Sequence, residues 1–204
     1  MSASTFLSLS MLQFIAAYAM VVIVPGPVTF ATGGLAALQG FGRTLPLLAG
    51  IGVGRAALTA LMAFGAAHLA ATLSLPAARI CGAAMLCAMA WRMALATPPA
   101  MEGQSRRLGG NLFVEGVAIG FLSPQTAAFY AAGLVGLMLE APGNALSLVT
   151  IATIITIGWH AAVAALLSRP FVRNAALRHH RAVCRAAATT LCSLALYSAL
   201  PNAA

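Results

Sequence analysis

Two short proline-containing segments carry many of the side chains that could do chemistry in this sequence. Each interrupts a long apolar run, and a proline frees a backbone carbonyl because it lacks an N–H. Freed carbonyls, hydroxyls and an amide are neutral groups that can bind the amino, carboxylate or hydroxyl groups of a small polar solute. We therefore predict that both segments line a substrate-binding site. Their residues are Pro25, Gly26 and Pro27 in the first segment and Ser123, Pro124, Gln125 and Thr126 in the second.

Arg55 is the least expected residue, because it falls well inside an apolar run. At about 1.5 Å per helical residue, it lies roughly 15 Å beyond Leu45, where that run begins. A charge this deep in a bilayer costs at least about 2.5 kcal/mol and usually faces a cavity or a partner. We predict that Arg55 faces a functional cavity and binds substrate, with an anionic substrate group or Glu115 as its counter-ion.

Two other ionisable residues are candidates for proton coupling. Glu115 stands about one turn inside another apolar run, so its carboxylate can either reach water or turn inward toward Arg55. A carboxylate held away from water can alternate between charged and neutral forms, as a proton-coupled step requires. His160 lies well inside a further run, where an imidazole forms a helix–helix hydrogen bond or relays a proton.

The composition is typical of a membrane protein. The 204 residues are 61% hydrophobic and 7% charged, whereas a soluble domain is about half apolar and a quarter charged. The net charge of +8 comes entirely from arginines, which gather beside the apolar runs. Interleaved aromatic and basic residues, which a nucleic-acid surface needs, are missing. We expect a lipid bilayer and a small polar solute as partners, and no nucleic acid.

The sequence provides neither a metal site nor catalytic residues. Four cysteines lack Cys-x-x-Cys spacing and nearby acids, so they do not predict metal binding. With three Glu and no Asp in the whole chain, a membrane-embedded enzyme would lack its base and its metal ligands. We predict a protein without enzymatic activity, metal or cofactor.

Six runs are long and apolar enough to cross a bilayer, which takes about 20 helical residues. Connections rich in Gly, Pro or Arg separate them, and connections this short require antiparallel neighbours. The expected fold is an all-α polytopic membrane protein of about six transmembrane helices. The spans are 6–30, 45–69, 76–96, 111–139, 145–167 and 182–200, and the connections are 33–43, 74–76, 97–110, 140–144 and 168–181.

The distribution of arginines predicts an orientation. The first, third and fifth connections hold the arginines that lie between spans, whereas the other side holds only Arg79, near the start of the third span. Arginine-rich loops stay in the cytoplasm. We therefore predict a multi-pass protein of the inner (plasma) membrane with both termini outside the cytoplasm. The N-terminus lacks the positive start of a signal peptide, so the first run is expected to remain in the mature protein.

The spans divide into two related halves, residues 1–100 and 111–204, joined by a cytoplasmic loop at 101–110. Three spans in each half make any repeat an inverted one. The proline breaks fall in the first span of each half, and helices interrupted at corresponding positions indicate a transporter site near the membrane midplane. We predict a 3+3 inverted repeat with the substrate site between its halves.

A pair of glycines in the second span predicts close helix packing. Gly50 and Gly54 form a Gly-x-x-x-Gly pattern, which lets two helices approach through backbone contacts. A phosphate-binding loop is excluded, because no strand precedes the pattern and no Gly-Lys-Ser/Thr follows it.

These motifs resemble those of the lysine exporter and homoserine/threonine-resistance (LysE/RhtB-type) amino-acid exporters, and the resemblance covers most of the chain. Residues 24–27 resemble the family's Pro-Gly-Pro signature, and the glycines of the second span stand at the family's spacing. Residues 113–129 resemble its Phe-x-x-Gly, Asn-Pro-Lys and alanine-rich aromatic pattern. The matching residues are Gly40, Gly42, Arg43, Gly50, Ile51, Gly54, Phe113, Gly116, Ser123, Pro124, Gln125, Ala127, Ala128 and Phe129.

This chain is identified as a divergent member of that family. Where many members have Asn-Pro-Lys it has Ser123-Pro124-Gln125, and where many have an acid after the second-span glycine it has Arg55. Compared with that pattern, the positive charge therefore stands at position 55 instead of position 125. The resemblance implies proton-driven export of amino acids or similar small zwitterionic metabolites from the cytoplasm.

Two other functions remain open for a membrane protein of this kind. A cation or metal exporter of a related fold would need an intramembrane Asp, a His pair or a Met-Cys cluster, and Arg55 would repel its cargo. A non-transporting membrane scaffold would need Arg55 for assembly but not for solute flux. The sequence is compatible with either a monomer or a homodimer.

Overall fold

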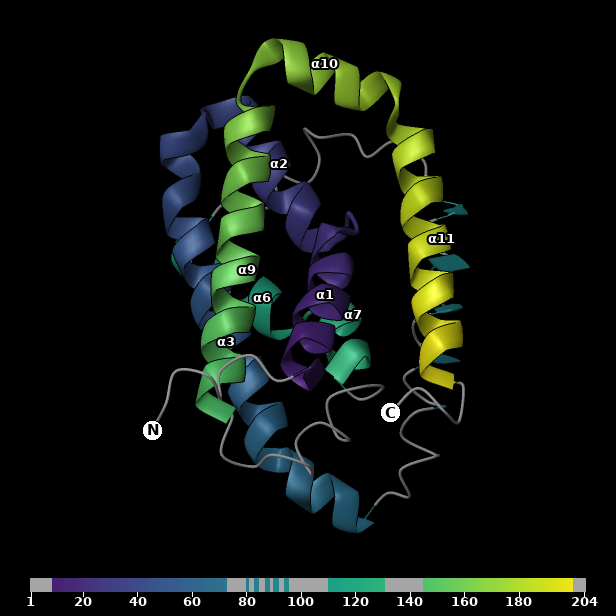
Figure 1. Ribbon diagram of the computed structural model, residues 1–204. Coiled ribbons are helices and arrows are strands. Elements are labelled where there is room, and N and C mark those ends of the chain that lie inside the picture. The colour runs from purple at the N-terminus through teal and green to yellow at the C-terminus, as the bar shows by residue number, and fades with distance from the viewer. Residues whose placement is uncertain are drawn as a thin grey trace.

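The computed structural model describes residues 9–72, 110–130 and 145–199, with the short pieces 80, 83–84, 87–88, 90–91 and 94–95. Within these residues the regular elements are helices (Figure 1). They are α1 (Leu9–Ile23), α2 (Pro27–Gln39), α3 (Phe41–Thr72), α6 (Leu112–Phe121), α7 (Pro124–Phe129), α9 (Ala145–Leu167), α10 (Pro170–Arg178) and α11 (His180–Ala199). The expected all-helical class is confirmed for this part of the chain.

Three stretches of the described chain are long and apolar enough to cross a membrane, and the bent pair α1–α2 makes a fourth candidate. The three are Phe41–Gly65, Leu112–Phe129 and Ala145–Leu167. The last of these has the bounds predicted for the fifth span. The predicted third span, 76–96, and residues 131–144 lie largely or wholly outside the described residues, so six spans and the boundary between two halves stay predictions.

The first predicted connection, 33–43, is wrong, because α2 continues through it to Gln39. Gly33 does not form a turn but packs against α9. A Cβ at Gly33 would lie 2.5 Å from a methyl carbon of Leu167 on that helix. The chain turns at Gly40, whose φ of 85° suits glycine. The fifth predicted connection is also partly helical, because Pro170 begins α10 at the helix position where a missing N–H costs nothing.

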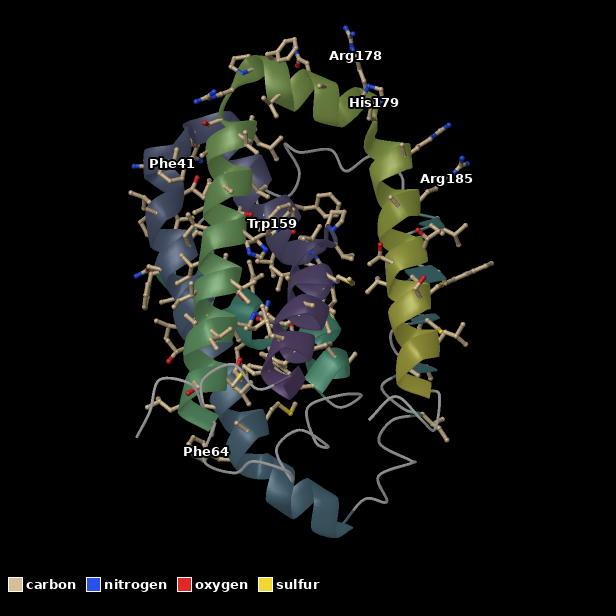
Figure 2. The ribbon with its side chains drawn as sticks, in the orientation of Figure 1. Phe41, Phe64, Trp159, Arg178, His179 and Arg185 are labelled. Atoms are coloured by element: carbon tan, nitrogen blue, oxygen red, sulfur yellow. The ribbon has the colours of Figure 1, made fainter. Side chains whose placement is uncertain are left out.

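The helices begin and finish at two common ends of the bundle, the basic end and the opposite end. The basic end is where α2 and α9 finish and α3 begins, with Arg43 and Arg169 exposed there. Figure 2 shows Phe41, Arg178 and His179 at this end, and Phe64 toward the other. The opposite end is where α1 and α9 begin, and an apolar cluster of α1, α3, α7 and α9 fills it.

Close packing of α3 against α6 is confirmed, and four glycines on facing turns explain it. A Cβ on Gly50 would overlap the carbonyl oxygen of Phe113, and one on Gly54 would overlap that of Val117. Likewise a Cβ on Gly116 or Gly120 would overlap carbonyl oxygens of α3. Gly50 meets Phe113 and Gly54 meets Val117, so both helices advance in the same direction. The two helices are therefore parallel, and α6 also begins at the basic end.

Candidate functional site

The first predicted break lies between α1 and α2, which meet at an angle of 54°. In a continuous helix the carbonyl of Val21 would accept from residue 25, but Pro25 has no N–H to donate. The side-chain amide of Gln125 replaces it, with Nε2 donating to Val21 O at 2.6 Å. Pro27 then starts α2, and Phe30 N donates to Gly26 O at 3.0 Å.

The second predicted break separates α6 from α7 and is also confirmed. Leu122 ends α6, Ser123 is extended with ψ of 105°, and Pro124 begins α7. Ala127 N donates to Ser123 O at 3.1 Å, which restarts the helical hydrogen bonding. The hydroxyls of Ser123 and Thr126 lie 3.3 Å apart and are both buried.

The two breaks meet through Gln125, although about a hundred residues separate them in the chain. Besides bonding Val21, this side chain places Oε1 only 2.8 Å from where a Cβ on Gly26 would stand. A larger residue between the two prolines would push against this amide, so glycine leaves Gln125 in place. The structure thus brings the two predicted substrate-binding segments into one region.

Arg55 is buried in the middle of the Phe41–Gly65 span, with only 2% of its surface exposed. Its Nε and Nη1 atoms are buried and have no hydrogen-bond partner. Unpaired buried charge is costly, so buried donors without acceptors favour binding of a group that can accept from them. Within the described part of the chain, Arg55 is therefore available to bind an anionic group.

A threonine and a tyrosine hold the helical turn that carries Arg55. Thr59 Oγ1 donates to the carbonyl oxygen of Arg55 at 2.8 Å, and it also lies 2.6 Å from the hydroxyl of Tyr130, which directly follows α7. Since the single hydroxyl proton of Thr59 goes to the carbonyl, Tyr130 donates the second bond. Tyr130 also lies within electrostatic range of Arg55.

His160 on α9 is buried and held in a similar way. Its Nδ1 lies 2.8 Å from the carbonyl oxygen of Thr156, and a carbonyl can only accept, so Nδ1 carries the hydrogen. In the neutral form of the ring, Nε2 is therefore the proton-accepting atom. The Thr156 hydroxyl lies 2.7 Å from that of Tyr18 on α1. Arg55 is within electrostatic range of His160 as well.

Glu115 occupies the first turn of α6, nearer the basic end than Arg55. Its Oε1 accepts from Gly110 N at 2.9 Å, which caps the start of its own helix, while Oε2 is buried without a partner. It forms no ion pair with Arg55 in the described structure. In the searched parts of the chain, no group of three or more His, Cys, Asp or Glu residues could hold a metal ion.

Four buried residues at the site were not singled out from the sequence: Tyr18, Thr59, Tyr130 and Thr156. Helical spacing could have found two of them, because Thr59 follows Arg55 by four residues and Thr156 precedes His160 by four. The tyrosines are hydroxyl-bearing residues within seven positions of a proline break. Their partners could not be read from the sequence, because each bond joins distant helices.

Replacing Gln125 with leucine tests whether its amide joins the two breaks. The variant leaves Val21 O buried without a donor, which costs about 1–3 kcal/mol. We expect a lower melting temperature for the purified protein together with reduced transport. Gln39→Leu, at the exposed end of α2, is the control and should change neither. A Gln125→Leu protein of unchanged stability would show that this bond is not needed.

Comparison with known families gives the identity of this arrangement. The LysE type translocator family matches residues 19–201, which include both breaks, Arg55 and His160. Neither the curated proteins nor the solved structures contain a significant match. Membership accounts for the apolar helices. The chain belongs to the LysE type translocator family, a family of membrane transporters.

Proposed function

We propose that this protein is a secondary exporter of amino acids or similar small zwitterionic metabolites, driven by the proton gradient. The observation that carries the proposal is the buried guanidinium of Arg55, whose Nε and Nη1 have no partner, on a helix that packs against α2 and α6. A carboxylate oxygen can accept from either the Nε or the Nη1 donor, and such charge-assisted hydrogen bonds are strong. An α-amino acid supplies that carboxylate and a cationic group beside it.

The proline segments would bind the ammonium end of the substrate. An ammonium group donates three hydrogen bonds and needs oxygen acceptors. Gln125 Oε1, the hydroxyls of Ser123 and Thr126, and the carbonyls around the first break are buried acceptors of this kind. Pro25, Gly26, Pro27 and Pro124 would contribute through the backbone they open rather than through their side chains.

Crosswise packing supports an inverted 3+3 repeat. Each half has a broken helix followed by a straight one, α1–α2 with α3 and α6–α7 with α9. The long α3 packs mainly on α6 of the other half, and α9 packs on α3 and on α2, both of the other half. Rocking of such halves around a central site is the usual mechanism of alternating access. Residues 101–110 would then be the loop between the halves.

We place the basic end in the cytoplasm, so both termini would lie outside it. Exposed Arg43, Arg169, Arg178 and Arg181 at or near this end support the orientation, because cytoplasmic loops carry an excess of basic residues. A C-terminal reporter that signals from the cytoplasm would refute it. The inner membrane is the membrane in which a proton gradient could drive export.

His160 and Glu115 are the candidates for coupling to protons. His160 presents Nε2 in the buried region that also holds Arg55, whereas Glu115 lies at the cytoplasmic mouth in the proposed orientation. A proton on His160 could be exchanged as the substrate carboxylate binds or leaves Arg55. Glu115 could instead load protons at the basic end.

Purified protein in liposomes tests the proposal with a panel of radiolabelled amino acids and an imposed pH gradient. We expect counterflow of at least one zwitterionic amino acid, accelerated by the gradient and collapsed by a protonophore. His160→Gln or Glu115→Gln should uncouple flux from the gradient if that residue carries the proton. Absence of flux for the whole panel would exclude amino acids as substrates and favour a scaffold.

A further inference from the structure

Tyr18 and Tyr130, which were not predicted from the sequence, form one buried, stacked pair. The rings of Tyr18 and Tyr130 are 6.0 Å apart and within 3° of parallel. Tyr18 is 0% exposed and Tyr130 1% exposed. They come from α1 and α7, the two halves' broken helices, and both lie on the side of the breaks toward the opposite end.

Each tyrosine is bonded to the straight helix of the other half. Tyr18 OH lies 2.7 Å from Thr156 Oγ1 on α9, and Tyr130 OH lies 2.6 Å from Thr59 Oγ1 on α3. Both threonines stand one helical turn from a buried basic residue, Thr59 from Arg55 and Thr156 from His160. Through Thr59, Tyr130 is therefore linked to the backbone of Arg55, and Tyr18 is bonded to the threonine whose backbone carbonyl accepts from His160.

Further aromatic rings continue this layer toward the opposite end. Phe14 and Phe129 pack on the tyrosines with ring centroids 5.6 to 5.9 Å apart. Leu148 and Ala152 of α9 belong to the same buried cluster. A zwitterion at Arg55 could not cross this layer without separating the rings, because nothing in it replaces the water of a charged group.

We propose that the Tyr18–Tyr130 pair closes the substrate site toward the opposite end and positions Arg55 and His160 while it is closed. The inference rests on the proposed exporter function. Opening this side requires α1 to part from α9, or α7 to part from α3, which breaks one or both hydroxyl bonds. Exit of the substrate is thereby linked to the turns that hold the two basic side chains.

Accessibility of a single cysteine tests the closure without depending on transport. Ser123→Cys, introduced after Cys81, Cys87, Cys184 and Cys192 are changed to alanine, places a thiol beyond the stacked rings as seen from the opposite end. In intact cells a membrane-impermeant maleimide should label it slowly. Adding Thr59→Val or Thr156→Val should raise the labelling rate about fivefold each, the factor expected for one lost hydrogen bond.

Thr153→Val is the matched control, because Thr153 is on α9 but bonds only the carbonyl of Val149 in its own helix. It should leave the labelling rate unchanged. Tyr18→Phe, which keeps the ring and loses the hydroxyl, should behave like Thr156→Val and serves if the threonine variants fold poorly. Rapid labelling in the parent, or no difference between these variants and the control, would overturn the closure.

Transport measured on the same variants separates the two proposals. If the labelling rates change as expected but no amino acid moves in liposomes, the closure stands and the exporter function fails. If amino acids move but the labelling rates do not respond, the exporter stands and the closure fails. Thr59→Val should also raise the apparent KM more than Thr153→Val does, because it loosens the turn that carries Arg55.

Discussion

Replacing Arg55 with methionine is expected to abolish amino-acid export while leaving the protein folded in the membrane. The guanidinium is the buried cation proposed to bind the substrate carboxylate, and hydrogen bonds to charged groups contribute about 1.5–3 kcal/mol each. Removing one partner of a buried ion pair costs about 3–5 kcal/mol, so efflux at limiting substrate should fall at least a hundredfold. Initial rates in proteoliposomes measure this effect.

Insertion should become easier in the same variant. An arginine near the membrane centre costs about 2.5–3.5 kcal/mol on insertion scales, and methionine removes that cost at similar length. We therefore expect equal or higher yield of folded Arg55→Met protein. Arg43→Gln, at the exposed basic end of the same helix, is the control and should keep its efflux. An Arg55→Met protein that exports normally would remove the basis of the substrate site.

Adding one methyl group at Gly54 is expected to weaken the whole protein. A Cβ there would overlap the carbonyl oxygen of Val117 and come within 2.8 Å of Phe121 N, and neither backbone atom can move alone. Separating α3 from α6 to make room should cost about 1–3 kcal/mol or more. The melting temperature of the purified Gly54→Ala protein should fall by several degrees, and export should fall with it.

Gly65→Ala is the matched control, since it makes the same change on the same helix. No described atom lies within 4 Å of a Cβ at Gly65. Alanine favours a helix over glycine by about 1 kcal/mol, so this variant should be as stable as the parent or slightly more stable. Equal melting temperatures for Gly54→Ala and the parent would contradict the close contact between α3 and α6.

The departures from the family pattern acquire a physical meaning in the structure. Gln125 stands where the resemblance leads one to expect lysine, and its amide donates to the carbonyl that Pro25 leaves unpaired. A neutral amide can make that bond without placing a second buried cation near Arg55. Among the described residues of the proposed site, the permanent positive charge therefore stands on α3 rather than at the start of α7.

Much of the architecture could be predicted because its causes are local. Apolar length, proline and glycine act on the backbone within a few residues, so both breaks, the Gly-x-x-x-Gly contact and the bounds of α9 follow from the sequence. The same reasoning failed at 33–43. There the glycines looked like a connection, yet Gly33 faces Leu167 from a helix far along the chain.

The amino-acid sequence by itself determined a membrane transporter with two broken helices and one deeply placed arginine. Only the tertiary structure decided which groups meet: Gln125 with Val21, Tyr130 with Thr59, and Tyr18 with Thr156. It also separated Glu115, bonded to Gly110, from Arg55. The composition and residue spacing of a segment determine how that segment folds in a membrane. A hydrogen bond between distant residues depends instead on how whole helices pack.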